Sequence, residues 1–359
     1  MALQLNTVCP LPDRPRPIIG IGAGGIVRDA HLPAYRLAGF DVAGVFDLDP
    51  DKARALAADF DIPTVFDSMA AAVDAAPDDV VFDVAVPGGA VLSVIESLPD
   101  GATVLIQKPL GRNLAEARRI QTACRRKELT AAVNFQLRYA PPFLALRDLL
   151  DSGRLGRIHD IQMQVTLLTP WNLWGFLEQE ERVEILYHSI HYLDAIRSIA
   201  GDPDGVYART VRYAGYEKLA DVKSTTILDY GDTLRAVVAA NHCHGGDLTH
   251  QESYLRVEGE GGIAHLTLGL CLDYPRGQPD RFDICLFEEG AAPVWRTEPI
   301  EGTWFPHAFI GTMASVMRAA EDPTRELPTS VDDATRTMAL VEAAYESSAT
   351  GATPIAYEE

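Results

Sequence analysis

Three glycines near the N-terminus constrain the fold of this chain more than any other feature. Gly20, Gly22 and Gly25 are spaced as G-x-G-x-x-G, after the apolar run 17–21 and before a stretch typical of helix. In such an array the first glycine permits a tight turn, the second lets the backbone approach a pyrophosphate, and the third lets helix pack on strand. The free N–H groups of the helix start then face the phosphates. We predict a dinucleotide-binding loop made of Gly20, Gly22, Ala23, Gly24, Gly25 and Ile26.

An acid after the next apolar segment supports this interpretation. The segment 42–46 is followed by Asp47, at about the ~20-residue spacing expected of a ribose-binding carboxylate. Such a carboxylate accepts hydrogen bonds from the ribose hydroxyls of NAD and repels a 2′-phosphate. No cation follows it directly, and Arg28 and Arg54 would have to fold in to hold a phosphate. The sequence therefore favours NAD over NADP; the alternative is a glycine turn beside an unrelated surface acid.

Composition narrows the class of protein. A chain of 359 residues is expected to form two domains, and its net charge of −20 argues against nucleic acid or an anionic membrane as a partner. No apolar run approaches the ~20 residues of a membrane span, and the first 17 residues lack the apolar core of a signal peptide. The five cysteines are scattered, without C-x-x-C spacing. We expect a soluble, reduced, cytoplasmic protein.

Hydrophobic periodicity changes along the chain. Up to about residue 138, short apolar strands alternate with helical patterns, which predicts a parallel, doubly wound sheet. After Gly201, strand patterns follow one another without helices, which predicts an antiparallel sheet. The expected early strands are 18–21, 42–46, 80–86, 103–106 and 130–133, with helices at 50–60, 68–75 and 113–127. The expected later helices are 141–150, 185–199, 305–320 and 331–349, and the later strands are 158–168, 207–213, 223–229, 235–242, 254–258, 263–268 and 282–287.

These patterns predict an α/β Rossmann domain joined to an α+β domain with a large open, mainly antiparallel sheet. We expect an extended N-terminal arm over 1–16, the Rossmann domain over 17–138, and a substrate-binding and oligomerisation domain over 139–359. The closing helix, 331–349, has the option of packing back on the first domain. One face of an open sheet stays exposed unless a second copy packs on it, so we expect a homodimer or homotetramer.

Lys108 lies where a nicotinamide is expected. It follows the predicted strand 103–106, and the carboxyl ends of parallel strands face the ligand crevice of a doubly wound sheet. Pro109 restricts the turn that aims the lysine. A lysine there is able to hold a substrate hydroxyl by a charge-assisted hydrogen bond. The alternative is an ordinary surface lysine after a strand.

A second cluster of polar residues occurs in the predicted helix 185–199. Glu184, Tyr187, His188 and His191 fall on one side at helical spacing, and apolar residues fall on the other. Such a helix either lines a site or faces solvent. Two histidines near an acid also resemble metal ligands, and so do His242 and His244, which share a strand face. Because no third ligand is fixed by the spacing, we predict no metal site and interpret these histidines as structural or pocket-lining.

Together these features resemble the Gfo/Idh/MocA family, the glucose–fructose oxidoreductase and inositol dehydrogenase group, nearly from end to end. The resemblance rests on the glycine array, Asp47, the Lys108–Pro109 turn, the segment 134–141 (NFQLRYAP) and the segment 191–194 (HYLD). It implies NAD(P)-dependent oxidation or reduction of a secondary alcohol on a sugar, inositol or related polyol. It also maps the family's Glu-Lys-Pro lysine onto Lys108 and its proton-transferring histidine onto His191.

The chain departs from the family pattern at three positions. The glutamate of Glu-Lys-Pro is Gln107, the aspartate four residues before the histidine is Tyr187, and a histidine after Pro87 is Val91. Tyr187 or His188 then becomes the candidate proton relay. With Lys108 and His191, the further site candidates are Pro87 and Gln107 toward the cofactor, and Gln136, Arg138, Trp171, Trp174 and His188 toward the substrate.

Two other functions stay open at this point. One is a non-catalytic, NAD(P)-binding regulator of sugar metabolism on the same fold. The other is an NAD-dependent lyase or glycosidase that acts through a transient keto-sugar. Both use the same cofactor domain, so these residues alone do not separate them from a dehydrogenase.

Overall fold

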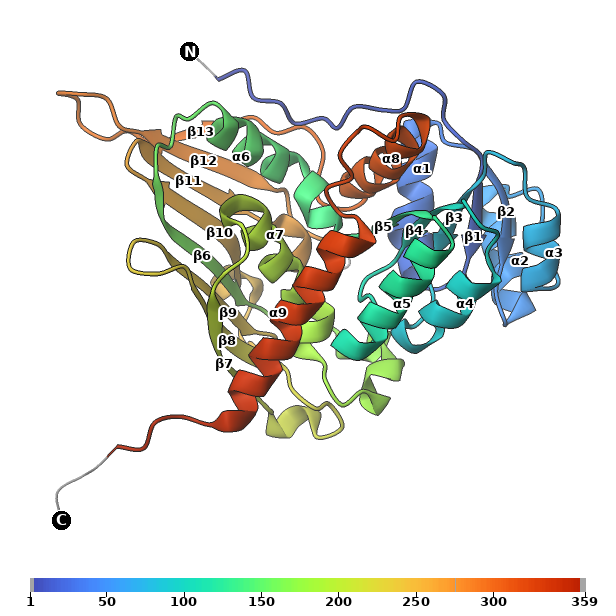
Figure 1. Cartoon of the computed structure of the whole chain (residues 1–359). Helices are drawn as coiled ribbons and strands as arrows, with labels where there is room; N and C mark the ends of the chain where they lie inside the picture. The colour runs from blue at the N-terminus through green and yellow to red at the C-terminus, as the bar shows by residue number, and fades with distance from the viewer. Residues whose placement is uncertain (1–2, 275, 356–359) are drawn as a thin grey trace. The chain divides into compact units, whose positions relative to one another are not determined.

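The chain folds into two compact units in the computed structural model, which describes residues 3–274 and 276–355 (Figure 1). The first unit comprises residues 1–153, 279–282 and 297–338. The second comprises residues 154–278, 283–296 and 339–359. Among the described residues, no helix is long and apolar enough to traverse a bilayer.

A five-stranded, all-parallel sheet forms the centre of the first unit, with strand order β2-β1-β3-β4-β5. This confirms the predicted doubly wound sheet. Every residue of β1, β3 and β4 is buried, as expected of strands covered by helices on both faces. The strands are β1 (Ile18–Ile21), β2 (Val42–Phe46), β3 (Val81–Val84), β4 (Thr103–Ile106) and β5 (Thr130–Val133).

Side-chain caps set the starts of several helices in this unit. Asp49 accepts hydrogen bonds from the backbone N–H groups of the first turn of α2, and Pro50 occupies the first helical position. Ser68 and Asn113 cap α3 and α5 in the same way. The helices are α1 (Leu32–Ala38), α2 (Pro50–Phe60), α3 (Met69–Asp74), α4 (Val91–Ser97), α5 (Leu114–Arg126), α6 (Pro141–Asp151) and α8 (His307–Glu321).

Helix α8 completes the core of the first unit although about half of the chain separates it in sequence from β5, the last strand of the sheet. It packs on β4, β5 and α1, and Figure 1 draws it beside α1. Phe309 and Met313 of α8 join Tyr35 and Leu105 in one buried apolar cluster. Because this contact joins distant segments, it also brings α8 side chains up to the ends of the strands.

An eight-stranded sheet dominates the second unit, with order β13-β12-β11-β10-β6-β9-β8-β7. The pairs β10–β11, β10–β6, β7–β8 and β8–β9 are antiparallel, and β6 pairs with β9 in parallel, which confirms the expected open, mainly antiparallel sheet. Helix α7 (Ile190–Ala200) packs on β9. The strands are β6 (Ile158–Thr166), β7 (Gly205–Val211), β8 (Lys223–Asp229), β9 (Arg235–Asn241), β10 (Glu252–Gly259), β11 (Gly262–Thr267), β12 (Arg281–Leu286) and β13 (Arg296–Glu298).

The last helix, α9 (Val331–Thr350), protects the edge strand β7. Ser347 Oγ accepts a hydrogen bond from the backbone N–H of Ala208 at 2.9 Å, and Ser348 Oγ accepts one from Thr210 at 3.0 Å. Unpaired edge groups are templates for unwanted strand addition. Two serine hydroxyls near the end of α9 therefore accept hydrogen bonds from backbone N–H groups on the free edge of β7.

Candidate functional site

The glycine loop between β1 and α1 passes tightly against the backbone that follows β3. Gly22 has φ of 111°, and a Cβ there would lie 2.3 Å from the carbonyl oxygen of Ala85. Only glycine fits this position. A Cβ at Gly24 would meet no atom within 4 Å, so the backbone there borders open space. The chain then enters a π-helical turn, η1 (Val27–His31), before α1 begins.

Asp47 is held against this loop. Its Oδ2 accepts a hydrogen bond from the Ala23 backbone N–H at 2.7 Å, and its Oδ1 accepts one from Asp49 N–H at 2.8 Å. The two arginines that a 2′-phosphate would need have other partners, since Arg28 pairs with Asp59 and Arg54 pairs with Asp51. A fixed carboxylate, with Arg28 and Arg54 both paired to other acids, suits the ribose hydroxyls of NAD.

Lys108 follows β4 at the same edge of the sheet as the glycine loop. Its backbone N–H donates to Gln107 Oε1 at 2.8 Å, and Gln107 is buried while Lys108 is half-buried. Burial lowers the pKa of Lys108 from 10.5 to about 8. Pro87, which follows β3, begins a short turn at this edge. A lysine with a pKa near neutral, at the carboxyl end of a parallel strand, is suited to bind and protonate an oxygen.

A buried polar network that sequence reasoning missed lies behind Gln107. His31, at the end of η1, is fully buried and contacts Asp83 of β3, Gln107 after β4 and Asn134 after β5. Asp83 could have indicated this network, because it is the one charged residue in the otherwise apolar predicted strand 80–86. His31 carried no comparable signal, since a single histidine in a helical segment has no distinctive spacing.

Two substrate candidates of the first unit lie in η3 (Gln136–Tyr139). Arg138 donates to Asp333 Oδ2 at 2.7 Å and to the Pro328 carbonyl at 2.9 Å, so its guanidinium is engaged within the unit. Gln136 is 2% exposed, and its Oε1 has no hydrogen-bond partner among the described residues. Buried polar atoms without partners are uncommon and mark places where a ligand or water binds.

The candidate residues of the second unit are gathered around a second π-helical turn. Tyr187 and His188 belong to η6 (Ile185–Ser189), and His191 lies in the first turn of α7. Both Tyr187 and His191 are buried, so this side of the helix faces protein rather than bulk solvent. π-Helical turns occur frequently at functional sites, because the extra residue re-aims side chains.

Aromatic rings surround His188. Its ring lies 4.9 Å from that of Trp171, 6.1 Å from that of Trp174 and 4.6 Å from that of His242, measured between centroids. The structure thus brings together Trp171, Trp174 and His188, three residues predicted to line the substrate wall. The faces of such rings pack well on the apolar faces of sugar rings.

Glu184 and His242 form a buried pair beneath these rings. His242 Nε2 lies 3.3 Å from Glu184 Oε1, and its Nδ1 lies 2.7 Å from Thr169 Oγ1. Asp221 accepts hydrogen bonds from the backbone N–H groups of Val183 and Glu184, and burial raises its pKa to about 6. No three histidine, cysteine or acidic residues in the described ranges are grouped closely enough to hold a metal ion.

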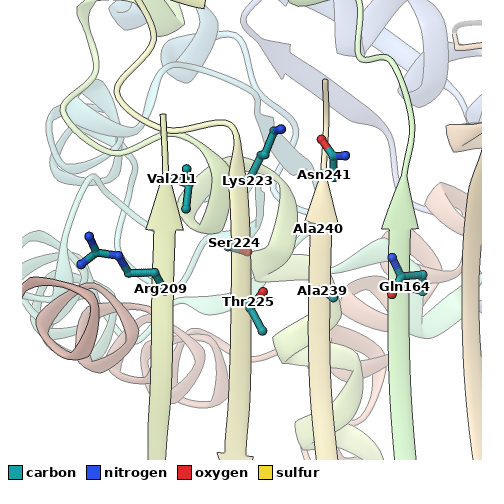
Figure 2. A pocket seen from close by; sticks show the side chains of 9 residues that line it. All are labelled: Gln164, Arg209, Val211, Lys223, Ser224, Thr225, Ala239, Ala240 and Asn241. Carbon is teal, nitrogen blue, oxygen red and sulfur yellow. The ribbon is translucent and has the colours of Figure 1, made fainter. Parts of the chain in front are cut away.

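A hollow of about 290 Å³ lies on the large sheet (Figure 2). Its strands are β6, β7, β8 and β9, and two cations, Arg209 and Lys223, border it. Arg209, Thr225, Ala239 and Gln164 are register partners across the four strands. None of the residues predicted for catalysis or cofactor binding lines this hollow.

Two family models match the chain and together cover most of it. The model described as "Oxidoreductase family, NAD-binding Rossmann fold" matches residues 18–135. The model described as "GFO/IDH/MocA C-terminal domain" matches residues 143–265. The first match contains the glycine loop, Asp47 and Lys108, and the second contains the π-helical turn η6.

Relatives of known name include sugar and polyol dehydrogenases. The chain is 27% identical to a D-apiose dehydrogenase of Paraburkholderia graminis over 344 residues, which cover 93% of this chain and 88% of that protein. It is 37% identical to an inositol 2-dehydrogenase of Streptomyces avermitilis over 142 residues, which cover 39% of this chain and 41% of that protein.

Solved structures share the fold along almost the whole chain. An oxidoreductase from Agrobacterium radiobacter in complex with NAD⁺, L-tartaric acid and magnesium superposes with a TM-score of 0.79 at 21% identity, covering 94% of this chain and 98% of that one. A levoglucosan dehydrogenase in complex with NADH and levoglucosan superposes with a TM-score of 0.77 at 17% identity and the same coverage. With the two family matches, these findings show that the chain belongs to the Gfo/Idh/MocA family of NAD-dependent oxidoreductases.

Proposed function

We propose that this protein transfers a hydride between NAD and a secondary alcohol, or the matching ketone, of a sugar, inositol or related polyol. The observation that carries the proposal is Lys108, a lysine with a pKa of about 8 at the carboxyl end of β4, in the sheet that holds the glycine loop. The names of the D-apiose and inositol dehydrogenases support the substrate class.

Each candidate residue has a role that its chemistry supports. The loop 20–26 and Asp47 hold the cofactor, whose nicotinamide accepts or supplies the hydride. Lys108 donates a hydrogen bond to the reacting oxygen and favours its alkoxide-like state. His191 takes or gives the proton of that oxygen, and Tyr187 or His188 stands in for the family's aspartate as proton relay. We assign the relay to Tyr187 or His188 because Tyr187 stands where the family has an aspartate.

The substrate wall is proposed to include Trp171 and Trp174, with His188 between them. Their rings supply apolar faces within the second unit. In the first unit, the buried Oε1 of Gln136 is proposed separately as an acceptor for a sugar hydroxyl. Sugar sites combine aromatic faces with a small number of placed polar groups. We place the protein in the cytoplasm because its five cysteines are scattered and lack C-x-x-C spacing. We propose no nucleic-acid or membrane partner because its net charge of −20 opposes binding to phosphate-rich surfaces.

We further propose a homodimer or homotetramer that covers the open face of the large sheet. Tyr207 of β7 and Ile227 of β8 are register partners and are 65% and 45% exposed. They lie on the same face as the hollow in Figure 2, with Val211 47% exposed nearby. Neighbouring exposed apolar side chains on a sheet face are typical of an interface.

The test is a reduction and oxidation screen of the purified protein. Formation of NADH from NAD⁺, or its consumption, is followed by absorbance with aldoses, anhydro-sugars, inositols and keto-sugars. Wild type is expected to turn over at least one of these, and Lys108→Met is expected to lose turnover while retaining NAD affinity. Lys52→Met, on exposed α2, is the matched control and should retain both.

Tight NAD binding without turnover of any compound in either direction would instead support the non-catalytic regulator. Elimination or glycosidic cleavage without net NADH formation would support the lyase or glycosidase.

A further inference from the structure

We infer that His31 is a positioning residue for Lys108, acting through Gln107, and that a neutral His31 and an amide at position 107 are a matched pair. This inference rests on the proposed function. It concerns only residues of the first unit, and it gives a role to the buried Asp83 that the hydride-transfer scheme leaves unused.

The geometry forms a continuous chain of hydrogen bonds from β3 to the backbone of Lys108. Asp83 Oδ2 lies 2.7 Å from His31 Nδ1, and His31 Nε2 lies 3.0 Å from Gln107 Nε2. Gln107 Oε1 then accepts the Lys108 N–H at 2.8 Å. His31, Asp83 and Gln107 are at most 7% exposed, so water does not compete for these bonds.

The position of the ring proton of His31 follows from the hydrogen-bond partners of the ring. Gln107 Oε1 is occupied by the Lys108 N–H, so Gln107 presents its NH₂ group to His31. Asn134 Oδ1 accepts from Thr312 Oγ1 at 2.8 Å, so Asn134 also presents its NH₂ group to His31 Nε2, at 3.3 Å. Two donors converge on Nε2, which must therefore carry its lone pair. The ring proton lies on Nδ1 and is donated to Asp83.

The other groups packed around His31 agree with a neutral ring. Tyr35 donates to Asp83 Oδ2 at 2.9 Å, and burial together with the Asp83 charge holds the pKa of this phenol well above its usual 10, so it stays a donor. The Phe309 ring covers His31 at a centroid distance of 4.9 Å. Asp83 is thus the one acid among the described groups that contact the ring, and it already receives two protons.

The glutamate found in the family motif would not fit this arrangement. A carboxylate at position 107 places an acceptor against the lone pair of His31 Nε2, and the pair would have to bind a further proton to restore the bond. With glutamine, the network closes without an added charge. The Gln107 amide therefore holds the backbone of Lys108 in place, and its replacement of the family's glutamate does not imply loss of activity.

The first test is the tautomer of His31 in the wild-type protein, which needs no substrate. Nitrogen NMR of ring-labelled histidine at pH 7 should show one buried histidine with its proton on Nδ1, and the signal should be absent from His31→Gln. A proton on Nε2, or a charged ring, would overturn the inference. This result also stands if the proposed dehydrogenase activity fails, since it depends on neither NAD nor a substrate.

The second test separates positioning from stability. In His31→Asn the amide nitrogen replaces Nδ1 and keeps the bond to Asp83, whereas in His31→Gln the amide oxygen replaces Nε2 and keeps the link to Gln107. His31→Gln should lose more thermal stability yet keep more of kcat, and His31→Asn should lose ~10- to 100-fold in kcat, as expected when a reacting group is misplaced. Tyr35→Phe removes the hydroxyl that bonds Asp83 and lies 3.4 Å from His31 Nδ1, but it leaves both contacts of His31 Nε2 in place. It is the matched control and should keep kcat.

If kcat instead follows the loss of melting temperature across the three variants, His31 has a structural role only and the inference fails. If neither His31 variant folds, the tautomer in wild type still decides. Absence of any turnover by wild type refutes the proposed function and leaves the tautomer as the test of the network.

Discussion

Replacement of Lys108 by methionine should stabilise the protein at neutral pH while it removes catalysis. The pKa of Lys108 is lowered to about 8 from 10.5 because burial disfavours the charged ammonium. Below pH 8 the lysine is charged in both the folded and the unfolded chain, so the folded state carries the whole cost of desolvation. Methionine fills a similar volume without a charge.

The structure sets the size of the effect. Each unit of pKa corresponds to ~1.4 kcal/mol, so the lowered pKa corresponds to at most about 3 kcal/mol. Because Lys108 is only half-buried, solvent screens part of this cost. We expect a gain of ~1–2 kcal/mol in the free energy of unfolding at pH 7. Between about pH 8 and 10.5 the folded wild type releases the proton before the unfolded chain does, so wild type becomes more stable and the gain shrinks.

Denaturant unfolding of wild type, Lys108→Met and the exposed control Lys52→Met at pH 7 and pH 10 measures this directly. We expect Lys108→Met to be more stable than wild type at pH 7, its advantage to fall at pH 10, and Lys52→Met to show neither change. A Lys108→Met protein that is less stable than wild type by the same amount at both values would refute the charge cost.

Three further predictions address the cofactor, the buried acid and the assembly. Asp47→Ala should weaken NAD binding by ~10- to 100-fold, through loss of charge-assisted bonds, without weakening NADP, as measured by fluorescence titration; equal loss for both cofactors would remove Asp47 from the ribose site. Asp221→Asn keeps an oxygen for the two backbone N–H groups and removes a buried carboxylate whose pKa is raised to about 6. The free energy of unfolding should therefore rise by ~1–2 kcal/mol at pH 7 and not rise near pH 4, where Asp221 of folded wild type is protonated. A gain that does not change with pH would contradict this. Ile227→Arg should convert the wild-type oligomer to monomers in sedimentation, and an unchanged oligomer would place the interface elsewhere.

The fold was predictable because local patterns determine most of it. The alternation of strands and helices up to residue 138 predicted the parallel sheet, and Asp49–Pro50 and Asn113 marked helix starts that the structure confirms. The parallel pairing of β6 and β9 was not predictable, because it depends on where the β7–β8–β9 meander returns. Short-range periodicity carries no information about that return.

The candidate site could be predicted where a reactive side chain directly follows a strand. It could not be predicted where side chains from distant segments meet. The position of Lys108 after β4 follows from the strand pattern alone. The network around His31 joins η1, three strand ends and Thr312 of α8, so no window of sequence contains it. The π-helical turns that hold His31 and His188 also escaped prediction, because the apolar pattern around them fits an ordinary helix.

Hydride transfer between NAD and a sugar or polyol is tested most directly by following the hydride itself. NADH deuterated at C4 is incubated with the protein and a keto-sugar or keto-inositol that the screen identifies, and the products are examined by mass spectrometry. If hydride transfer takes place as proposed, the new carbinol carbon carries one deuterium for each NAD⁺ formed, and Lys108→Met transfers none. Unchanged NADH that stays bound, or a product that gains hydrogen only from solvent without net oxidation of NADH, would contradict it.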